Sequence, residues 1–182
     1  DQLALIRQFV RLSPLLSVTL YDLDRHAARA QQLGVDLAPA TFIRSGRSQV
    51  QYVGMASGTL LAAFMDAMSY VYVGRTPLDD ASREVLAALE RPVHVEILGA
   101  PYDAVSGHLM RLTAAMAAEC RHVRPRIVDA TEYPLFAARR QVTGVPVIVI
   151  EGQRFAGLWE EADLVEQIRR AAAGETEPVA DR

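Results

Sequence analysis

Apolar and polar positions change period several times along the chain, and these changes predict alternating strands and helices. Residues 92–98 alternate, with Val93, Val95 and Ile97 separated by polar residues, as in a strand with one buried face. Apolar residues at helical spacing follow over about residues 103–123. The remaining pattern predicts strands at 126–129, 147–150 and 154–157, and helices at 134–141 and 160–173. This β-α-β-α-β-β-α order indicates an α/β fold whose first two strands are parallel.

The first part of the chain shows the same succession of signals without its leading strand. The chain starts inside a helical pattern, and the expected elements are then a strand at Leu15–Leu23, a helix at 25–33, strands at 40–43 and 49–53, and a helix at 58–70. Segments 22–43 and 129–150 align at a constant offset of about 107 positions, so that Pro39 matches Pro146. The sequence therefore predicts two tandem units of one α/β type.

The expected organisation has four parts. Residues 1–74 form a first unit that is incomplete at its N-terminus, 75–91 a connecting helix, 92–173 a second unit and 174–182 a flexible tail. The sequence Thr76-Pro77-Leu78-Asp79 is typical of a capping box, and it predicts that the connecting helix starts there and ends near Leu89.

Composition excludes several classes of function. The net charge of −3 argues against a nucleic-acid partner, which normally requires a basic face. No apolar run approaches the roughly 20 residues that span a bilayer, so no membrane partner is expected. The single cysteine, Cys120, excludes an internal disulfide framework and fits a cytoplasmic location. The four histidines show no metal-ligand spacing, so we expect neither a metal nor a cofactor.

Two prolines stand at matched positions before apolar strands. Pro39 follows Ala38 and Pro146 follows Val145, each between an expected helix and an expected strand. A proline that merely starts a strand is the ordinary interpretation. Because the same arrangement occurs twice, we expect a cis peptide bond at both positions, exposing a backbone edge to a ligand or a partner strand.

Specific segments make the chain resemble a known family. They are Leu37-Ala38-Pro39-Ala40-Thr41, Tyr52-Val53-Gly54, Thr131-Glu132-Tyr133-Pro134, Gly144-Val145-Pro146, and Arg91-Pro92-Val93 leading into Pro101-Tyr102. With the predicted element order, these resemble the glutaredoxin-like protein disulfide oxidoreductases, which carry two thioredoxin-fold units in one chain. The resemblance implies a fold of two tandem thioredoxin-like units over essentially the whole chain.

The resemblance also locates a degenerate active-site loop. Where the family has Cys-Pro-Tyr-Cys, this chain has Ala100-Pro101-Tyr102-Asp103. Dithiol exchange needs a thiolate nucleophile and a second thiol, and neither remains here. At a helix N-terminus, the carboxylate of Asp103 is expected to cap backbone N–H groups rather than act as a catalytic acid.

Two hypotheses of function remain open. In the first, the protein is of the thiol–disulfide oxidoreductase type, and any catalysis belongs to a Cys-x-x-Cys upstream of Asp1. In the second, it is a non-catalytic module that binds an extended peptide or a protein partner. The resemblance places the substrate groove at Ala38, Pro39, Val145, Pro146 and Gly157. A first unit without its leading strand exposes a sheet edge, so a homodimer is also an expected partner arrangement.

Two further residues carry sulfur or aromatic chemistry. Cys120 lies late in the expected long helix, where we interpret it as a small buried apolar residue rather than a reactive thiol. Trp159 precedes the last helix and is interpreted as an aromatic residue that covers the edge of the core, the alternative being an exposed partner site.

Overall fold

One mixed β-sheet runs through the whole computed structural model, which describes residues 1–175. Its strands, in chain order, are β1 (Ala40–Ser45), β2 (Ser48–Val53), β3 (Val93–Gly99), β4 (Val123–Asp129), β5 (Val147–Ile150) and β6 (Gln153–Ala156). The helices are α1 (Gln2–Leu12), α2 (Ala27–Gln32), α3 (Gly58–Val73), α4 (Asp80–Ala87), α5 (Ala104–Glu119), α6 (Pro134–Arg139) and α7 (Glu161–Ala173). The element order from β3 to α7 is the predicted β-α-β-α-β-β-α.

The sheet joins the two halves of the sequence. Its strand order is β1-β2-β4-β3-β5-β6, and β2 pairs in parallel with β4, with Tyr52 opposite Ile127. The pair β3–β4 is parallel, as predicted for the first crossover, whereas β5 is antiparallel to β3. The sequence contains no signal for the β2–β4 pairing, which makes the two units share one sheet.

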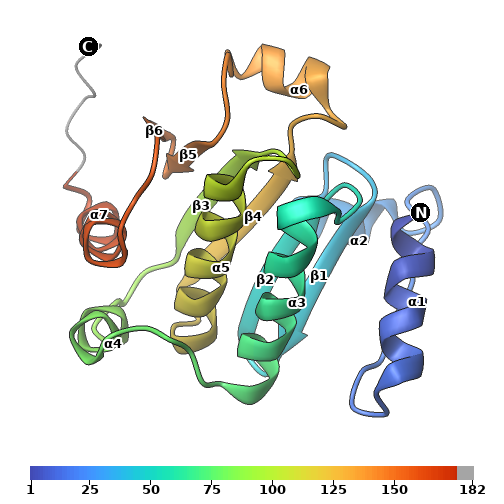
Figure 1. Ribbon diagram of the computed structural model, residues 1–182, viewed down its shortest axis with the longest axis horizontal. Coiled ribbons are helices and arrows are strands. Elements are labelled where there is room, and N and C mark those ends of the chain that lie inside the picture. Colours follow the sequence, from blue (N-terminus) through green and yellow to red (C-terminus); the bar gives the residue numbers. More distant parts are fainter. Residues whose placement is uncertain (176–182) are drawn as a thin grey trace.

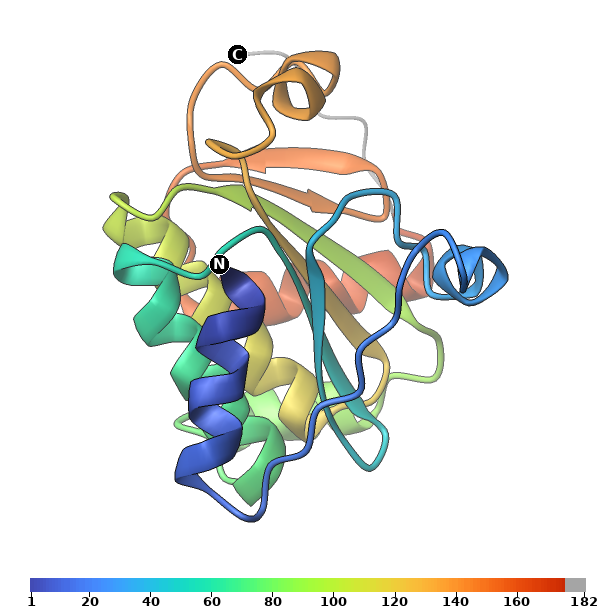
Figure 2. The same ribbon diagram turned by 90° about the vertical axis from the view of Figure 1, so that its right-hand side faces the viewer.

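The main core lies on one face of this sheet. Helices α3 and α5 pack side by side there, with α1 at one end and α4 and α7 at the other (Figure 1). Val93, Val95 and Ile97 are fully buried against these helices, as their alternation predicts. The rings of Tyr52 and Phe64 meet edge to face at 5.5 Å in the same core. Helix α2 lies on the other side of the sheet (Figure 2).

A network of charged side chains fixes α6 over that other face. Glu96 on β3 pairs with Arg126 on β4, at 3.1 Å between nitrogen and oxygen, and with Arg140 after α6, at 3.0 Å. Arg126 also pairs with Asp36, which follows α2. Both guanidinium groups lie over the ring of Phe136, at 5.6 and 4.9 Å from its centroid. Side chains from both units therefore meet in one ionic cluster.

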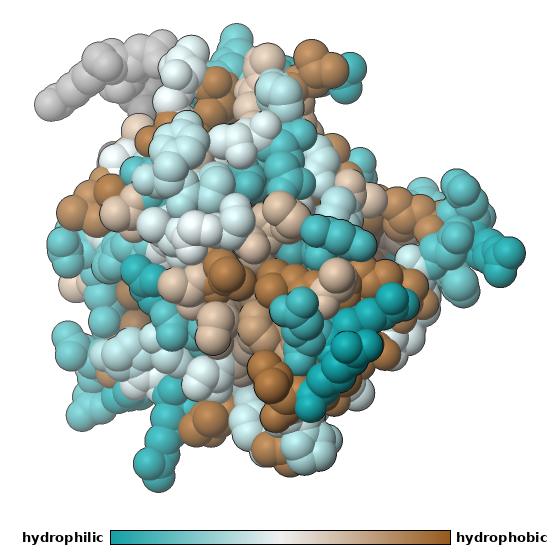
Figure 3. Space-filling view, turned by 45° about the vertical axis from the view of Figure 1, so that its right-hand side comes forward, coloured by the Kyte–Doolittle hydropathy of each residue, from teal (hydrophilic) through white to brown (hydrophobic). Residues whose placement is uncertain are grey.

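The strand prediction for Leu15–Leu23 is wrong. This segment has no ladder partner among the described residues, because β1 is the last strand of the sheet on that side. Its apolar residues stay exposed, including Leu15 at 64% and Leu20 at 64%. Figure 3 brings the α1 side of the molecule forward and shows apolar side chains among polar ones on that face. Alternation without a neighbouring strand does not make a strand.

Two helix boundaries also differ from the prediction. The long helix, expected to reach residue 123, ends at Glu119, because Val123 starts β4 and pairs with Val93. The connecting helix starts at Asp80 with Asp79 as its N-cap residue, not at the predicted capping box. The hydroxyl of Thr76 donates instead to Glu119 Oε1 at 2.5 Å. The other boundaries lie within a few residues of their expected positions.

The C-terminal part of the description ends shortly after α7. Gly174 caps that helix with φ of +76°, a left-handed conformation suited to glycine. The flexible tail expected at 174–182 lies mostly outside the described residues. Within residues 1–175, no helix combines the length and the apolar character that crossing a membrane requires.

Candidate functional site

The predicted site loop of the second unit lies at one edge of the sheet, where the parallel strands end. Gly99 is opposite Asp129 at the ends of β3 and β4, so Ala100 begins the loop at this edge. On the other side of β3, Leu98 pairs with Val147, which places Pro146 beside the same loop. Because Val147 also pairs with Ala156, Gly157 lies next to Pro146. The structure therefore brings the 100–103 loop, Val145–Pro146 and Gly157 to one edge.

The loop is a hydrogen-bonded turn that Ser106 holds in place. The backbone N–H of Asp103 donates to the carbonyl of Ala100 at 3.1 Å. One carboxylate oxygen of Asp103 accepts from the backbone N–H of Ser106 at 2.6 Å and from its hydroxyl at 2.5 Å. The Ser106 hydroxyl oxygen in turn accepts from the N–H of Ala100 at 3.1 Å. Asp103 is the N-cap residue of α5, which confirms the capping interpretation.

No thiol lies at this loop. Ala100 is fully buried, whereas the side chain of Tyr102 is 77% exposed beside it. Cys120 is buried at the opposite end of α5, whose 16 residues span roughly 24 Å at 1.5 Å per residue. The interpretation of Cys120 as a small buried residue is confirmed, and its sulfur lies far from Pro146.

The start of α3, in the first unit, contacts the 100–103 loop of the second unit. The backbone N–H of Thr59, at the start of α3, donates to the carbonyl of Pro101 at 2.8 Å, and its hydroxyl oxygen lies 2.8 Å from the carbonyl of Asp103. Gly58 has φ of +51°, and a Cβ there would lie 2.1 Å from the Pro101 carbonyl oxygen. Gly107 of α5 also approaches Thr59, since its Cβ would be 3.0 Å from the Thr59 carbonyl oxygen. Sequence reasoning missed this contact, although glycines at both positions were the available signal.

The two predicted cis-prolines, Pro39 and Pro146, lie at different positions along the sheet. The Ala38–Pro39 and Val145–Pro146 bonds are both cis, as predicted. Strands β2, β4 and β3 separate β1 from β5, which puts the two prolines about 19 Å apart at the usual spacing of neighbouring strands. Next to Pro39, the side chain of Gln2 in α1 donates to the hydroxyl of Thr41 at 3.2 Å. Ala38 and Pro39 therefore lie apart from Val145, Pro146 and Gly157, at the same end of the sheet.

The buried carboxyl group of Asp129 and the buried phenol of Tyr52 lie between the two prolines. Asp129 is buried, and its Oδ1 accepts from the backbone N–H of Thr131 at 2.9 Å and from the Thr131 hydroxyl at 2.6 Å. Burial raises the pKa of Tyr52 well above its usual value, and the nearby Asp129 and Glu132 carboxylates raise it further. The phenol of Tyr52 is therefore neutral at physiological pH and serves as a core side chain rather than as a base.

Other candidate residues take structural positions. Trp159 is partly buried and packs against the core, with its ring edge-to-face on Phe155 at 5.2 Å, which confirms that it covers the core. Among residues 1–175, no group of three or more His, Cys, Asp or Glu side chains could hold a metal ion.

Comparisons with known proteins agree on the fold. No protein-family model matches the chain, and a search of curated proteins finds no match. A protein disulfide oxidoreductase from Aeropyrum pernix superposes with a TM-score of 0.84 and 25% identity, over 96% of this chain and 79% of that one. The NTD_N/C domain of alkylhydroperoxide reductase AhpF from Enterococcus faecalis superposes with a TM-score of 0.80 and 17% identity, over 92% and 82%. The chain has a thioredoxin-like α/β fold.

Proposed function

We propose that this chain is of the thiol–disulfide oxidoreductase type and that its second unit is a redox-inactive partner. In this proposal the unit at residues 92–173 positions an extended protein or peptide substrate, and any dithiol exchange is performed by a Cys-x-x-Cys upstream of Asp1. The likeness to a protein disulfide oxidoreductase over 96% of the chain supports the type. The absence of cysteine from the 100–103 loop supports the division of labour.

The observation that carries the proposal is the geometry of the 100–103 turn. A hydrogen bond closes it from the Asp103 N–H to the Ala100 carbonyl, and in such a turn the outer two Cα atoms lie within about 7 Å. Disulfides join Cα atoms that are about 4.4–6.8 Å apart. A turn of this size brings positions 100 and 103 close to the separation that a disulfide spans, which supports the proposal that this loop corresponds to a dithiol turn.

Restoring both thiols tests this geometry. The double variant Ala100→Cys with Asp103→Cys is expected to form an internal disulfide and to catalyse insulin reduction by dithiothreitol above the level of the original chain. The matched control, Ala100→Ser with Asp103→Ser, has the same size and no thiol. Thiol counting with and without reductant reads out the bond even where turnover is slow. A folded double-cysteine variant that forms no disulfide would contradict a thioredoxin-type turn.

A wholly non-catalytic binding module is the alternative, and the exposure around the loop favours it. Ala100 is fully buried, which hinders attack from that position, whereas Tyr102 is 77% exposed to solvent. Exposed tyrosines combine an apolar ring with a hydrogen-bonding tip and are common at interfaces. The full gene product separates the two proposals: a Cys-x-x-Cys shortly before Asp1 supports the first, and its absence supports the second.

Substrate positioning has its own test. Tyr102→Ala should weaken the binding of an extended, unfolded peptide about tenfold, the loss of one interface anchor of about 1.4 kcal/mol. The matched control is Tyr72→Ala, because Tyr72 is 53% exposed at the other end of the molecule on α3. Fluorescence anisotropy with a labelled peptide measures both. Equal effects of the two substitutions would exclude a docking role for the loop.

A further inference from the structure

A second, unrelated feature lies at the opposite end of the sheet from the 100–103 loop. A cavity of about 450 Å³ opens there between the β1–β2 turn, the start of β3 and the segment that joins α5 to β4. The basic side chains that line it are Arg44, Arg47, Arg121, His122 and Arg124, and no Asp or Glu lines it. We call this feature the cationic pocket.

Two arginines of the pocket lie on strands of the sheet, Arg44 on β1 and Arg124 on β4. Arg44 is opposite Gln49 in the β1–β2 pair. The β2–β4 ladder begins at Gln51, which is opposite Arg126. Arg124 lies two residues before Arg126 on β4, so both side chains project from the same face of that strand. The Arg44 Nε donates to Gln49 Oε1 at 2.8 Å, which holds this guanidinium in place.

The walls of the pocket are tied to one another. The hydroxyl of Ser48 in the β1–β2 hairpin donates to the carbonyl of Ala118 near the end of α5 at 3.3 Å. The N–H of Val93 donates to the carbonyl of His122 at 2.7 Å. Arg47 stands at the tip of the hairpin, next to Gly46, whose φ of +57° suits a tight turn. The basic side chains thus project from connected elements rather than from loose loops.

The positive charge of the pocket is not compensated within residues 1–175. None of its four arginines has an ion-pair partner among the described carboxylates. Carboxylates on the same face of the sheet are engaged elsewhere: Glu96 with Arg126, and Glu151 with His94. The Nε of Arg121 donates to His122 Nε2 at 3.2 Å, which orients these two neighbouring side chains toward each other. Four guanidinium groups that form no ion pair with the carboxylates of residues 1–175 are a local concentration of positive charge in a chain of net charge −3.

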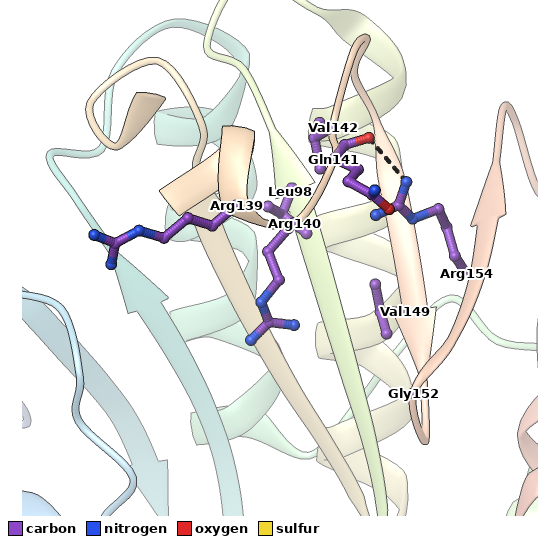
Figure 4. A pocket seen from close by; sticks show the side chains of 8 residues that line it. All are labelled: Leu98, Arg139, Arg140, Gln141, Val142, Val149, Gly152 and Arg154. Carbon is purple, nitrogen blue, oxygen red and sulfur yellow. Dashed lines mark hydrogen bonds between the residues drawn. The ribbon is translucent and has the colours of Figure 1, made fainter. Parts of the chain in front are cut away.

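A second cavity among the described residues has arginines that do not converge. It measures about 270 Å³, below the usual 300–1,000 Å³ of small-molecule sites, whereas the cationic pocket lies within that range. Figure 4 shows Arg139 pointing away from it and Arg154 bonded to the carbonyl of Gln141, at 2.9 Å. Arg140 is paired with Glu96. An arginine of this second cavity therefore serves as the control in the binding experiment below.

We propose that the cationic pocket binds a compact polyanion that carries several phosphate groups, such as an inorganic or nucleoside polyphosphate. Guanidinium groups donate paired hydrogen bonds that match phosphate oxygens, and four of them offset a ligand with three or four negative charges. The pocket is bounded rather than extended into a stripe, and the rest of the molecule is net acidic, which disfavours a polymeric nucleic acid.

Calorimetry with sodium tripolyphosphate at low ionic strength tests the proposal. The chain should bind it, and Arg47→Ala and Arg124→Ala should each weaken binding about tenfold, a loss of about 1.4 kcal/mol that suits one charge-assisted hydrogen bond. The control Arg139→Ala removes an exposed arginine of the second cavity and should leave the affinity unchanged. Circular dichroism verifies that each variant is folded.

Several outcomes would overturn the proposal. They are absence of tripolyphosphate binding, equal affinity in the Arg47→Ala, Arg124→Ala double variant, an equal loss in Arg139→Ala, and binding of sulfate as tight as that of tripolyphosphate. Tighter binding of poly-aspartate or of single-stranded RNA than of tripolyphosphate would also contradict it, because the occupant would then be a macromolecule. ATP and tripolyphosphate binding with similar affinity would show that the phosphates, and not the base, are recognised.

Discussion

Replacing Glu96 with alanine should destabilise the protein more than removal of any exposed acidic side chain. The Glu96 side chain is 13% exposed, and its carboxylate lies 3.1 Å from Arg126, whose side chain is 17% exposed, and 3.0 Å from Arg140. Breaking a fully buried ion pair costs about 3–5 kcal/mol because it leaves a charge without a partner, whereas an exposed pair contributes about 0–1 kcal/mol. Arg126 keeps its pairing with Asp36. The expected loss is therefore intermediate, about 2–3 kcal/mol.

Thermal and urea denaturation followed by circular dichroism measure this loss. For a chain of this length, 1 kcal/mol corresponds to roughly 2–4 °C, so Tm should fall by about 4–12 °C. A double-mutant cycle with Arg140→Ala should give a coupling energy of at least about 0.5 kcal/mol, since the two side chains are in contact. Glu166→Ala is the control, because Glu166 and its ion-pair partner Arg169 lie on the solvent-exposed side of α7, where an exposed pair contributes little and its removal should hardly move Tm. A change in Glu96→Ala as small as in this control would refute the reasoning.

Three further predictions concern single residues. Because burial raises the pKa of Tyr52, only the unfolded chain ionises this phenol as pH passes about 10, and the free energy of unfolding should fall above that pH. Urea denaturation at pH values from about 9 to 11 measures this fall, and Tyr52→Phe should make the decrease of the unfolding free energy with pH less steep. Gly58→Ala should lower the free energy of unfolding by about 2–4 kcal/mol, because a clash with the Pro101 carbonyl adds to a positive-φ strain of about 1–2 kcal/mol. Gly74→Ala is the control in the same denaturation assay: Gly74 has a φ of +68° and no atom within 4 Å of an added Cβ, so this variant should show the strain alone. Cys120 should react with a thiol reagent only after denaturant is added, and labelling of the native protein at the rate of a free thiol would contradict its burial.

The sequence predicts best those elements whose signals are local. β5 starts and ends at the residues expected, because Pro146 fixes its beginning and four apolar residues follow. Asp103 caps α5 as expected, since a short carboxylate before a helical run satisfies free N–H groups wherever the helix packs. The loop residues 100–103 could therefore be placed at a helix N-terminus from the sequence alone.

Features that depend on distant partners could not be predicted. Leu15–Leu23 has the composition of a strand, but a strand exists only beside another one, and none lies there among residues 1–175. The end of α5 is set by competition with β4, because Val123 pairs with Val93 instead of extending the helix. The contact of Thr59 with the 100–103 loop joins residues about 40 positions apart and has no periodic signature. The cationic pocket similarly assembles arginines from separate segments.

The parallel pairing of β2 with β4 has a consequence for any attempt to divide the protein. A cut in the segment between α3 and β3 would leave β2 in one piece and β4 in the other, each with a newly bared row of amide and carbonyl groups. Such halves would associate with each other, or with further copies of themselves, through these exposed strands and would not behave as independent domains. Genetic fusions and truncations of this chain should therefore keep residues 40–156 in one piece.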